Sequence, residues 1–445
     1  MKREWPNATD IVLLLLCLMY LITYVDRVNI ATAADFIRRD LHLSVSQLGI
    51  ALSAFGYPYL LFQVFGGWIG DRFGPRRTLF LCGLVWTAAT VLTGFAGSLA
   101  SLFAFRVLVG VGEGATFPVA TRAMQSWLPP GRRGFGQGLT HAFARFGNAI
   151  TPPIVAALML ASGWRGAFYV LGAFSLMWVI GWIVYFRDNP ADHPAISGYE
   201  LDQLRSAESL ALQRRSSASL SGERGVSQRR SSASLSGERV EIPWGALTAR
   251  MLPVTIVYFC YGWTLWLYLN WLPSFFLNEY KLDIRRSALF SSAVFFAGVV
   301  GDTLGGVVSD RILKATGDLR RARRDVVIVG FLGAFVCLLA MFATRDLTLI
   351  TLSLGAGFFF AEIVIGPMWA IPMDIAPEYS GTASGLMNTG SALAAILSPL
   401  AFGYITDATG NWHLPFAGSL GLLLLGAVLA PTMHPEKPLV TVPST

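Results

Sequence analysis

The sequence predicts an all-α membrane protein in which twelve transmembrane helices form two pseudo-symmetric six-helix bundles. Hydrophobic residues make up 54% of the 445 residues and charged residues only 14%, whereas soluble domains average about 25% charged residues. Apolar runs of about 20 residues, the length that crosses a bilayer, follow one another along the chain. Motifs of the first half also recur in the second half. Together these observations indicate one duplicated membrane domain.

The candidate spans form two groups of six on either side of a long polar stretch. The first group covers about residues 11–34, 46–70, 78–97, 100–125, 135–161 and 166–187. The second group covers about residues 250–277, 287–312, 325–343, 347–371, 381–406 and 412–433. We therefore expect an N-terminal bundle over residues 1–187, a cytoplasmic linker over 188–246, and a C-terminal bundle with a short cytoplasmic tail over 247–445.

The distribution of lysine and arginine predicts the orientation of these spans. With both termini in the cytoplasm, 23 of the 34 Lys and Arg residues lie on the cytoplasmic side, seven on the other side and four within spans. Cytoplasmic loops of membrane proteins carry an excess of these residues, so both termini are expected inside. The first apolar run is too long for a cleavable signal peptide and lacks a small-residue cleavage site, so we expect it to stay as the first span.

Two internal repeats differ in what they predict. Within the polar stretch, Gln213–Arg224 recurs as Gln228–Arg239, and this Ser/Arg-rich repeat cannot bury a core, so we expect a disordered linker with no catalytic role. The motif Gly67-Trp-Ile-Gly-Asp71-Arg72 after the second span reappears after the eighth as Gly306-Val-Val-Ser-Asp310-Arg311, at an offset of 239 residues. Gly138 and Gly385, in the fifth and eleventh spans, are likewise 247 residues apart. Halves related in this way are typical of transporters.

Several function classes are disfavoured. The four cysteines lie singly within apolar runs, which favours inert buried thiols over disulfides or metal ligands. The sequence shows no nucleophile–base or metal-ligand constellation, so we expect neither an enzyme nor a bound metal or cofactor. The basic residues punctuate apolar runs and do not gather on one polar domain, so nucleic acid is not expected as a partner.

The first span contains a carboxylate next to a guanidinium, Asp26 and Arg27, in the stretch Tyr24-Val-Asp-Arg-Val-Asn29. Each ionisable side chain at bilayer depth costs roughly 2.5–3.5 kcal/mol on insertion scales, so such residues usually face a polar cavity and have a partner. An ion pair that only fixes helix packing is the alternative. We favour a position on a transport path.

These motifs resemble known signatures. The run Gly67 to Arg77 resembles the loop signature of the major facilitator superfamily. Arg106-Val-Leu-Val-Gly-Val-Gly-Glu113, with Phe117-Pro118, resembles the fourth-helix signature of its anion:cation symporter family, whose first helix resembles Tyr24 to Asn29. That family includes bacterial galactonate, glucarate and hexuronate transporters and animal vesicular glutamate and sialic-acid transporters. The resemblance covers the chain except the linker.

The resemblance implies a major facilitator fold and proton-coupled uptake of an organic anion such as a sugar acid, by alternating access. It further implies a monomer in the bacterial inner membrane whose partners are the anion, the proton and membrane lipid. The alternatives are an anion exchanger or uniporter without proton coupling, and a non-transporting sensor of the same fold.

The resemblance makes Asp26 and Glu113 the proton-carrying acids. Arg106 and Glu113, seven residues apart, share a helix face but lie roughly 10.5 Å apart along the axis, so Arg106 is expected to tune Asp26 or Glu113 as a coupling partner. An acid whose arginine is taken by an anionic substrate would bind a proton more readily, and anion and proton would then favour each other's binding.

Arg27 is the best candidate to bind a substrate carboxylate, because its planar fork reaches two oxygens at once. Arg145 is a further buried cation that shares a face with His141 and Asn148. Where the galactonate transporters carry an uncharged amide, this arginine favours a second carboxylate or a more acidic substrate. Other substrate-binding candidates are Tyr59, His141, Asn270, Trp369 and Asn388. The alternative is a permanent salt bridge to a neighbouring acid for Arg27, a structural role for His141 and a packing role for Trp369.

Charged residues at the cytoplasmic helix ends are expected to act in gating, because contacts there must break and reform as the two halves rock. These residues are Asp71, Arg72, Arg76, Arg77, Asp310 and Arg311. Further acids lie in or near the C-terminal spans: Asp302 is a candidate second proton site, Asp374 is expected to be a gating or structural residue, and Glu362 has no assigned role.

Overall fold

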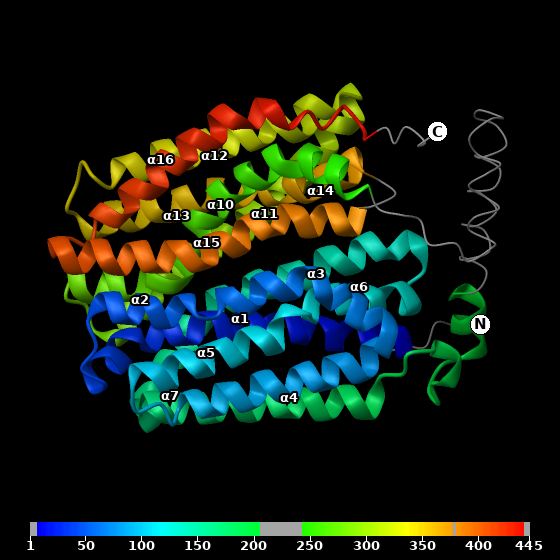
Figure 1. The fold of residues 1–445 in the computed structure, drawn as a ribbon, viewed down its shortest axis with the longest axis horizontal. Helices are drawn as coiled ribbons and strands as arrows, with labels where there is room; N and C mark the ends of the chain where they lie inside the picture. The colour runs from blue at the N-terminus through cyan, green and yellow to red at the C-terminus, as the bar shows by residue number, and fades with distance from the viewer. Residues whose placement is uncertain (1–6, 205–242, 377–379, 440–445) are drawn as a thin grey trace.

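The computed structural model describes residues 7–204, 243–376 and 380–439, and these residues form helices and short connections without a strand. Two helical bundles lie side by side with their helices roughly parallel to one long direction (Figure 1). The predicted all-α fold with two bundles is therefore confirmed. Residues 205–242, which hold the tandem repeat and most of the predicted linker, lie outside the described residues.

The N-terminal bundle contains seven helical segments. They are α1 (Ala8–Asp40), α2 (Val45–Ser53), α3 (Gly56–Phe73), α4 (Pro75–Thr93), α5 (Leu99–Gly114), α6 (Thr116–Trp127) and α7 (Pro130–Tyr185). A one-turn 3-10 helix, η1 (Pro190–Asp192), follows. Side chains of Asn7, Ser44 and Ser98 accept hydrogen bonds from backbone N–H groups at the starts of α1, α2 and α5. Gly163, with φ of +71°, divides the long α7 into two passes.

The C-terminal bundle repeats this arrangement. It contains α10 (Trp244–Glu279), α11 (Ile284–Thr316), the π-helix η2 (Arg320–Asp325), α12 (Val326–Ala340), α13 (Leu347–Ile363), α14 (Ile365–Ile375), α15 (Ser380–Thr409), α16 (Leu414–Leu429) and η4 (Ala430–Met433). The pass formed by α13 and α14 is interrupted at Val364, as the pass formed by α5 and α6 is interrupted at Ala115. The two halves thus share the order of their helices and also a helix break at the corresponding position.

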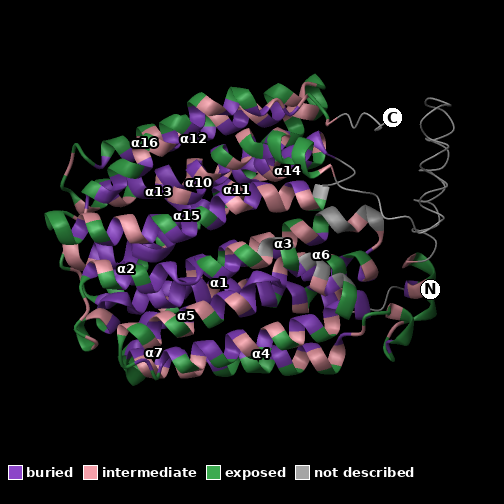
Figure 2. Ribbon diagram, in the orientation of Figure 1, coloured by how far each residue is buried: buried purple, intermediate pink, exposed green. Residues whose placement is uncertain are grey.

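The surface of the bundles is suited to lipid. Among the described residues, nine helical segments are long and apolar enough to cross a membrane, by length and composition. One of them contains the Gly163 break, and α4 and α12 add two further apolar helices, which agrees with the twelve predicted spans. Buried residues line the inside of each bundle, and exposed residues lie on the outer faces (Figure 2). Many of these are large and apolar, such as Leu61, Phe95 and Val184, as expected where the solvent is hydrocarbon.

Contacts between the two bundles gather at the end opposite the termini, which we call the far end. There the carboxylate of Asp407 in α15 accepts hydrogen bonds from the N–H groups of Val45 and Ser46, at 3.0 and 2.7 Å, and so caps α2 of the other bundle. The Asn278 side chain donates to Asp35 in the same region. At Gly49 of α2 a Cβ atom would lie 2.6 Å from the Pro399 carbonyl oxygen. The two bundles therefore close against each other at the far end.

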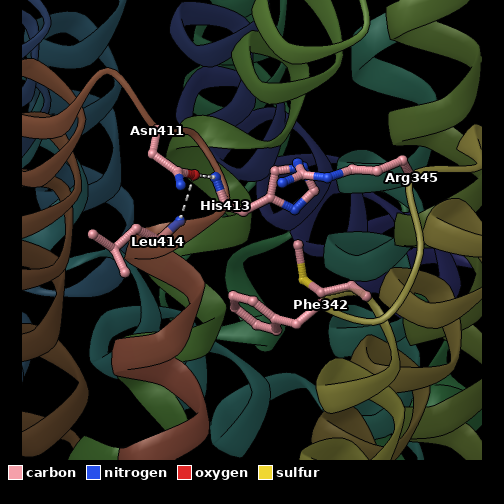
Figure 3. Close-up of a pocket in the computed structure, with 6 residues that line it drawn as sticks. Phe342, Arg345, Asn411, His413 and Leu414 are labelled. Carbon is pink, nitrogen blue, oxygen red and sulfur yellow. Dashed lines mark hydrogen bonds between the residues drawn. The ribbon is translucent and has the colours of Figure 1, made fainter.

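A small pocket of about 140 Å³ also lies at the far end, in the loops of the C-terminal bundle (Figure 3). Asn411 accepts hydrogen bonds from the N–H groups of His413 and Leu414, at 2.8 and 3.2 Å. The Glu279 carboxylate lies 3.2 Å from Arg345 and 3.1 Å from His413. Burial lowers the pKa of His413, although Glu279 opposes this effect. Of the described residues that were predicted for the site, none lines this pocket, and its contacts hold loops of one bundle together.

The cap that Asp407 places on α2 generates a prediction. Asp407→Ala removes two hydrogen bonds between the bundles, so it should open the far end. A cysteine introduced by Ser292→Cys reports on this interface, because Ser292 of α11 donates to the Ala149 carbonyl of α7. We expect Asp407→Ala to raise the labelling rate of this cysteine several-fold in the purified protein.

Asp283→Ala is the matched control for this experiment. Asp283 caps α11 within its own bundle, accepting from the Arg286 N–H at 3.0 Å, so its loss should leave the labelling rate unchanged. Equal rates in the Asp407→Ala and Asp283→Ala proteins would show that the Asp407 cap does not hold the bundles together.

Candidate functional site

Halfway along the helices, charged and aromatic side chains from both bundles meet. Asp26 and Arg27 of α1 lie at the centre and are 1% and 3% exposed. Glu113 and Arg106 of α5 and Arg145 of α7 are also buried. All five residues were predicted for the site, Asp26 and Arg27 from the cost of burying charges at bilayer depth and Glu113 from the family resemblance, and the structure places the five in one region.

Arg27 and Glu113 form an ion pair between α1 and α5. The Arg27 Nε atom lies 2.9 Å from Glu113 Oε2, and the two side chains are 2% and 0% exposed. Among the described residues, Arg27 Nη2 and Glu113 Oε1 have no hydrogen-bond partner. A buried ion pair stabilises a protein only when its remaining polar atoms are also satisfied. The incomplete bonding therefore points to a functional role and not to stability alone.

Five aromatic rings surround the Arg27 guanidinium, and we call them the aromatic box. The distances from Arg27 Cζ to the ring centroids are 4.6 Å for Tyr24, 4.9 Å for Tyr59, 5.1 Å for Phe117, 5.2 Å for Phe55 and 5.9 Å for Trp266. Cations are attracted to the faces of aromatic rings at such distances. Trp266 comes from α10, so the C-terminal bundle completes the box. The box fixes the guanidinium and excludes water around it.

Asp26, the neighbour of Arg27 in α1, is linked to Arg106 through its backbone. Arg106 Nη1 donates to the Asp26 carbonyl oxygen at 3.4 Å. The Asn29 side chain donates to Asp26 Oδ1 at 3.1 Å, and Asp26 Oδ2 has no hydrogen-bond partner among the described residues. Arg106 is thus placed beside Asp26, as a coupling partner would be, and its tuning role stays a prediction.

Arg145 holds two carboxylates of the other bundle. Its Nε atom lies 3.1 Å from Asp302 Oδ2 of α11 and 3.2 Å from Glu362 Oε2 of α13. The Tyr261 hydroxyl of α10 donates to Glu362 Oε1 at 2.9 Å. We call Arg145, Asp302 and Glu362 the Arg145 triad. The sequence drew attention to both acids but did not pair them with Arg145.

The ring of Tyr24 connects the two arginines. Arg27 Cζ lies 4.6 Å and Arg145 Cζ 5.6 Å from its centroid. The two guanidinium carbons therefore lie no farther apart than the sum of these distances, about 10 Å. Two cations this close, in a region closed to the far end, can hold two anionic groups of one small molecule.

The other predicted substrate-binding residues lie around these two arginines. The rings of His141 and Trp369 are 6.0 Å apart, and Trp369 Nε1 donates to the Tyr258 hydroxyl at 2.9 Å, beside Tyr261. Tyr59 belongs to the aromatic box and lies close to Asn388 of the other bundle. Asn270 uses its side-chain amide within α10, donating to the Trp266 carbonyl at 2.8 Å. The Asn270 side chain thus bonds to the backbone of its own helix.

The predicted gating residues lie near the end of the molecule that holds the termini. Arg323, which was not predicted from the sequence, lies 3.3 Å from Asp310 and 3.1 Å from Asp374. The N–H group of Arg76 donates to Asp188 at 2.8 Å, at the start of α4. Arg72 lies over the Phe73 ring, and Arg77 and Arg311 are exposed. The Asp71 side chain lies outside the described part of the chain, and the gating role of this group stays a prediction.

Within the described residues, no group of three His, Cys, Asp or Glu side chains is arranged to hold a metal ion. Each buried arginine of the site contacts the carboxylate or the backbone of an acidic residue, and an anionic ligand could take the place of such a carboxylate.

The chain is similar to known membrane transporters. The sequence model of the Major Facilitator Superfamily matches residues 16–399 and 254–444. A probable sulfoacetate transporter of Cupriavidus necator is 45% identical over 97% of this chain and 95% of its own length. A probable galactarate/D-glucarate transporter of Escherichia coli is 26% identical over 92% of this chain and 89% of its own length. The crystal structure of a bacterial homologue of the human lysosomal transporter Spinster, inward-facing and unoccupied, has the same fold, with a TM-score of 0.76, 16% identity and 97% of both chains covered.

The buried pair of Arg27 and Glu113 generates a stability prediction. Glu113→Gln leaves the buried Arg27 cation unpaired, which costs about 3–5 kcal/mol in comparable cases. We expect a clear fall in the apparent Tm of the purified protein. Asp40→Asn is the control, because its pair with Arg165 is about 40% exposed and exposed pairs contribute at most about 1 kcal/mol. Equal shifts in Tm for the two variants would contradict the importance assigned to the buried pair.

Proposed function

The chain belongs to the Major Facilitator Superfamily and, within it, to the anion:cation symporter family, and on this premise we propose that it imports a small organic dianion together with protons. It is a transporter of organic anions and not an enzyme. The proposal places it in the bacterial inner membrane with both termini in the cytoplasm, working as a monomer surrounded by lipid.

The two arginines around Tyr24 carry this proposal. A carboxylate or sulfonate bound by a guanidinium places its central atom about 4 Å from Cζ, given N–O distances of 2.7–2.9 Å. In sulfoacetate a single methylene separates the two anionic groups, so their central atoms lie about 2.5–3 Å apart. Such a molecule can contact Arg27 and Arg145 at once across a gap of up to about 10 Å. The relative of 45% identity is named as a probable sulfoacetate transporter, and a two-carbon sulfonate is our preferred substrate.

Proton coupling follows from the acids that already occupy these arginines. Arg27 holds Glu113, and Arg145 holds Asp302 and Glu362. A substrate anion can replace a carboxylate only if the carboxylate loses its charge, because otherwise two anions would face one cation in a dry environment. Anion and proton therefore favour each other's binding. We propose Glu113 as one proton carrier and Asp26, beside Arg106, as another.

Alternating access would expose this site first to one side of the membrane and then to the other, as the two bundles rock around it. The far end is held closed by the Asp407 cap on α2 and by Asn278 and Asp35. With the termini in the cytoplasm, the far end faces outward, and the described arrangement is closed to the outside. We propose that charged residues near the termini, including Asp310 and Arg323, exchange their present partners for partners in the other bundle when that end closes.

Counterflow of labelled sulfoacetate in proteoliposomes tests this proposal. The wild-type protein should exchange sulfoacetate. Arg27→Lys should raise the sulfoacetate concentration that gives half-maximal exchange at least ten-fold, because the point charge of lysine cannot replace a planar guanidinium held between five rings. Arg345→Lys is the control, since Arg345 pairs with Glu279 in an exposed loop and should leave exchange unchanged.

Two results would count against the proposal. If Arg27→Lys leaves the half-saturation concentration of sulfoacetate unchanged, Arg27 does not bind the substrate. If the wild-type protein exchanges galactarate or another sugar diacid but not sulfoacetate, the two-carbon sulfonate is not its substrate. The broader assignment, transport of an organic anion, would then still hold.

A further inference from the structure

We propose that Glu362 is a further proton carrier, so that the C-terminal bundle contributes its own proton to the uptake of each dianion. This inference rests on the proposed function, because it assigns a coupling role to an acid in the same site. It concerns a residue to which the sequence alone assigned no role.

Internal symmetry is the first observation behind the inference. Glu113 lies two residues before the break at Ala115, and Glu362 lies two residues before the break at Val364. Pro118 and Pro367 follow at the same distance, so both pairs are 249 residues apart. This offset is close to the 247 residues that relate Gly138 to Gly385. Glu362 is therefore the counterpart, in the second half, of a predicted proton carrier.

The contacts of Glu362 are the second observation. Like Glu113, its side chain is 0% exposed and its carboxylate lies against a buried arginine, here at 3.2 Å. The charged and titratable groups that face it are Arg145 of α7, Asp302 of α11 and Tyr261 of α10, with His141 of α7 beyond Arg145 and Asp302. A Cβ at Gly298 of α11 would lie 3.1 Å from Glu362 Cγ, so the backbone of α11 packs closely against the acid and holds it in place.

The charge balance of the Arg145 triad is the third observation. Two carboxylates share one guanidinium, whereas Arg27 and Glu113 balance one to one. A substrate group bound to Arg145 would place a third negative charge around this single cation. Protonation of one carboxylate reduces that excess and frees a place on the guanidinium. In this step the carboxylate takes up one proton and no covalent bond of the substrate changes.

Glu362 is better suited to this step than Asp302. The Asp302 side chain is 15% exposed and Glu362 is fully enclosed, so loss of water penalises the charged form of Glu362 more strongly. Tyr261 keeps a hydrogen bond to Glu362 Oε1 in either protonation state, since a hydroxyl can donate or accept. Asp302 would keep its contact with Arg145 and hold that arginine in position between the two bundles.

The test is isothermal titration of sulfoacetate into the purified protein, in buffers of different ionisation enthalpy, which measures the protons taken up per molecule bound. The wild-type protein should take up more protons than the Glu362→Gln variant, with a difference that approaches one. Glutamine imitates the protonated acid and leaves Arg145 available, so the variant should still bind, with an affinity that falls less steeply as pH rises. Glu279→Gln, a change at the far-end terminus of α10, should match the wild-type protein.

Other results would contradict either the role of Glu362 or the proposed function. Equal proton uptake by the wild-type and Glu362→Gln proteins, or loss of binding in a folded Glu362→Gln protein, would overturn the role of Glu362. If that variant fails to fold, Tyr261→Phe decides: loss of the hydroxyl should shift the pH dependence of binding to higher pH, and an unchanged dependence would contradict the inference. A wild-type protein that does not bind sulfoacetate would instead overturn the proposed function on which the inference depends.

Discussion

The buried ion pair between Arg27 and Glu113 is the interaction on which the rest of the site depends. Removing two charges from water costs several kcal/mol per ion, and only a close opposite charge offsets this cost. The 2.9 Å contact supplies that charge, and the aromatic box keeps water away from it. An anion that competes for Arg27 must therefore displace Glu113. In the proposed mechanism, charge balance in a dry region, more than the shape of that region, couples anion binding to protons.

The second half of the duplicated chain contains a related cluster of acid and arginine, but its balance of positive and negative charges differs. Glu362 occupies the position of Glu113, but its arginine, Arg145, comes from the other bundle and also holds Asp302. The Arg145 triad thus crosses between the bundles at mid-depth, and the Asp407 cap crosses between them at the far end. A rearrangement at one level must be accommodated at the other, as expected where packed bundles move as rigid bodies.

The fold could be predicted from the sequence almost completely, because long apolar runs without charges are typical of helices that cross a bilayer. The breaks at Ala115 and Val364 alter single passes and were not predicted, whereas the break at Gly163 lies between the predicted spans 135–161 and 166–187. The buried charges were also predictable, since their insertion cost singles them out. Their pairing was not: Arg145 and Glu362 are far apart in the sequence and meet only when the bundles pack.

The aromatic box and Glu362 differ in whether the sequence alone could have identified them. Phe55 and Trp266 of the aromatic box have the composition and spacing of ordinary core residues, so only their position around Arg27 reveals their role. Glu362, in contrast, did leave a signal. The 249-residue offset between Pro118 and Pro367 relates it to Glu113 and could have identified it before the structure.

The central claim is that an anion enters this site only in exchange for the charge of an acid, so that anion and proton move together. The most direct measurement is the pH inside wild-type proteoliposomes, followed with a trapped dye after sulfoacetate is added outside in the absence of any other gradient. We predict acidification of the interior that follows the entry of sulfoacetate in time. Accumulation of labelled sulfoacetate with no change in internal pH would contradict it.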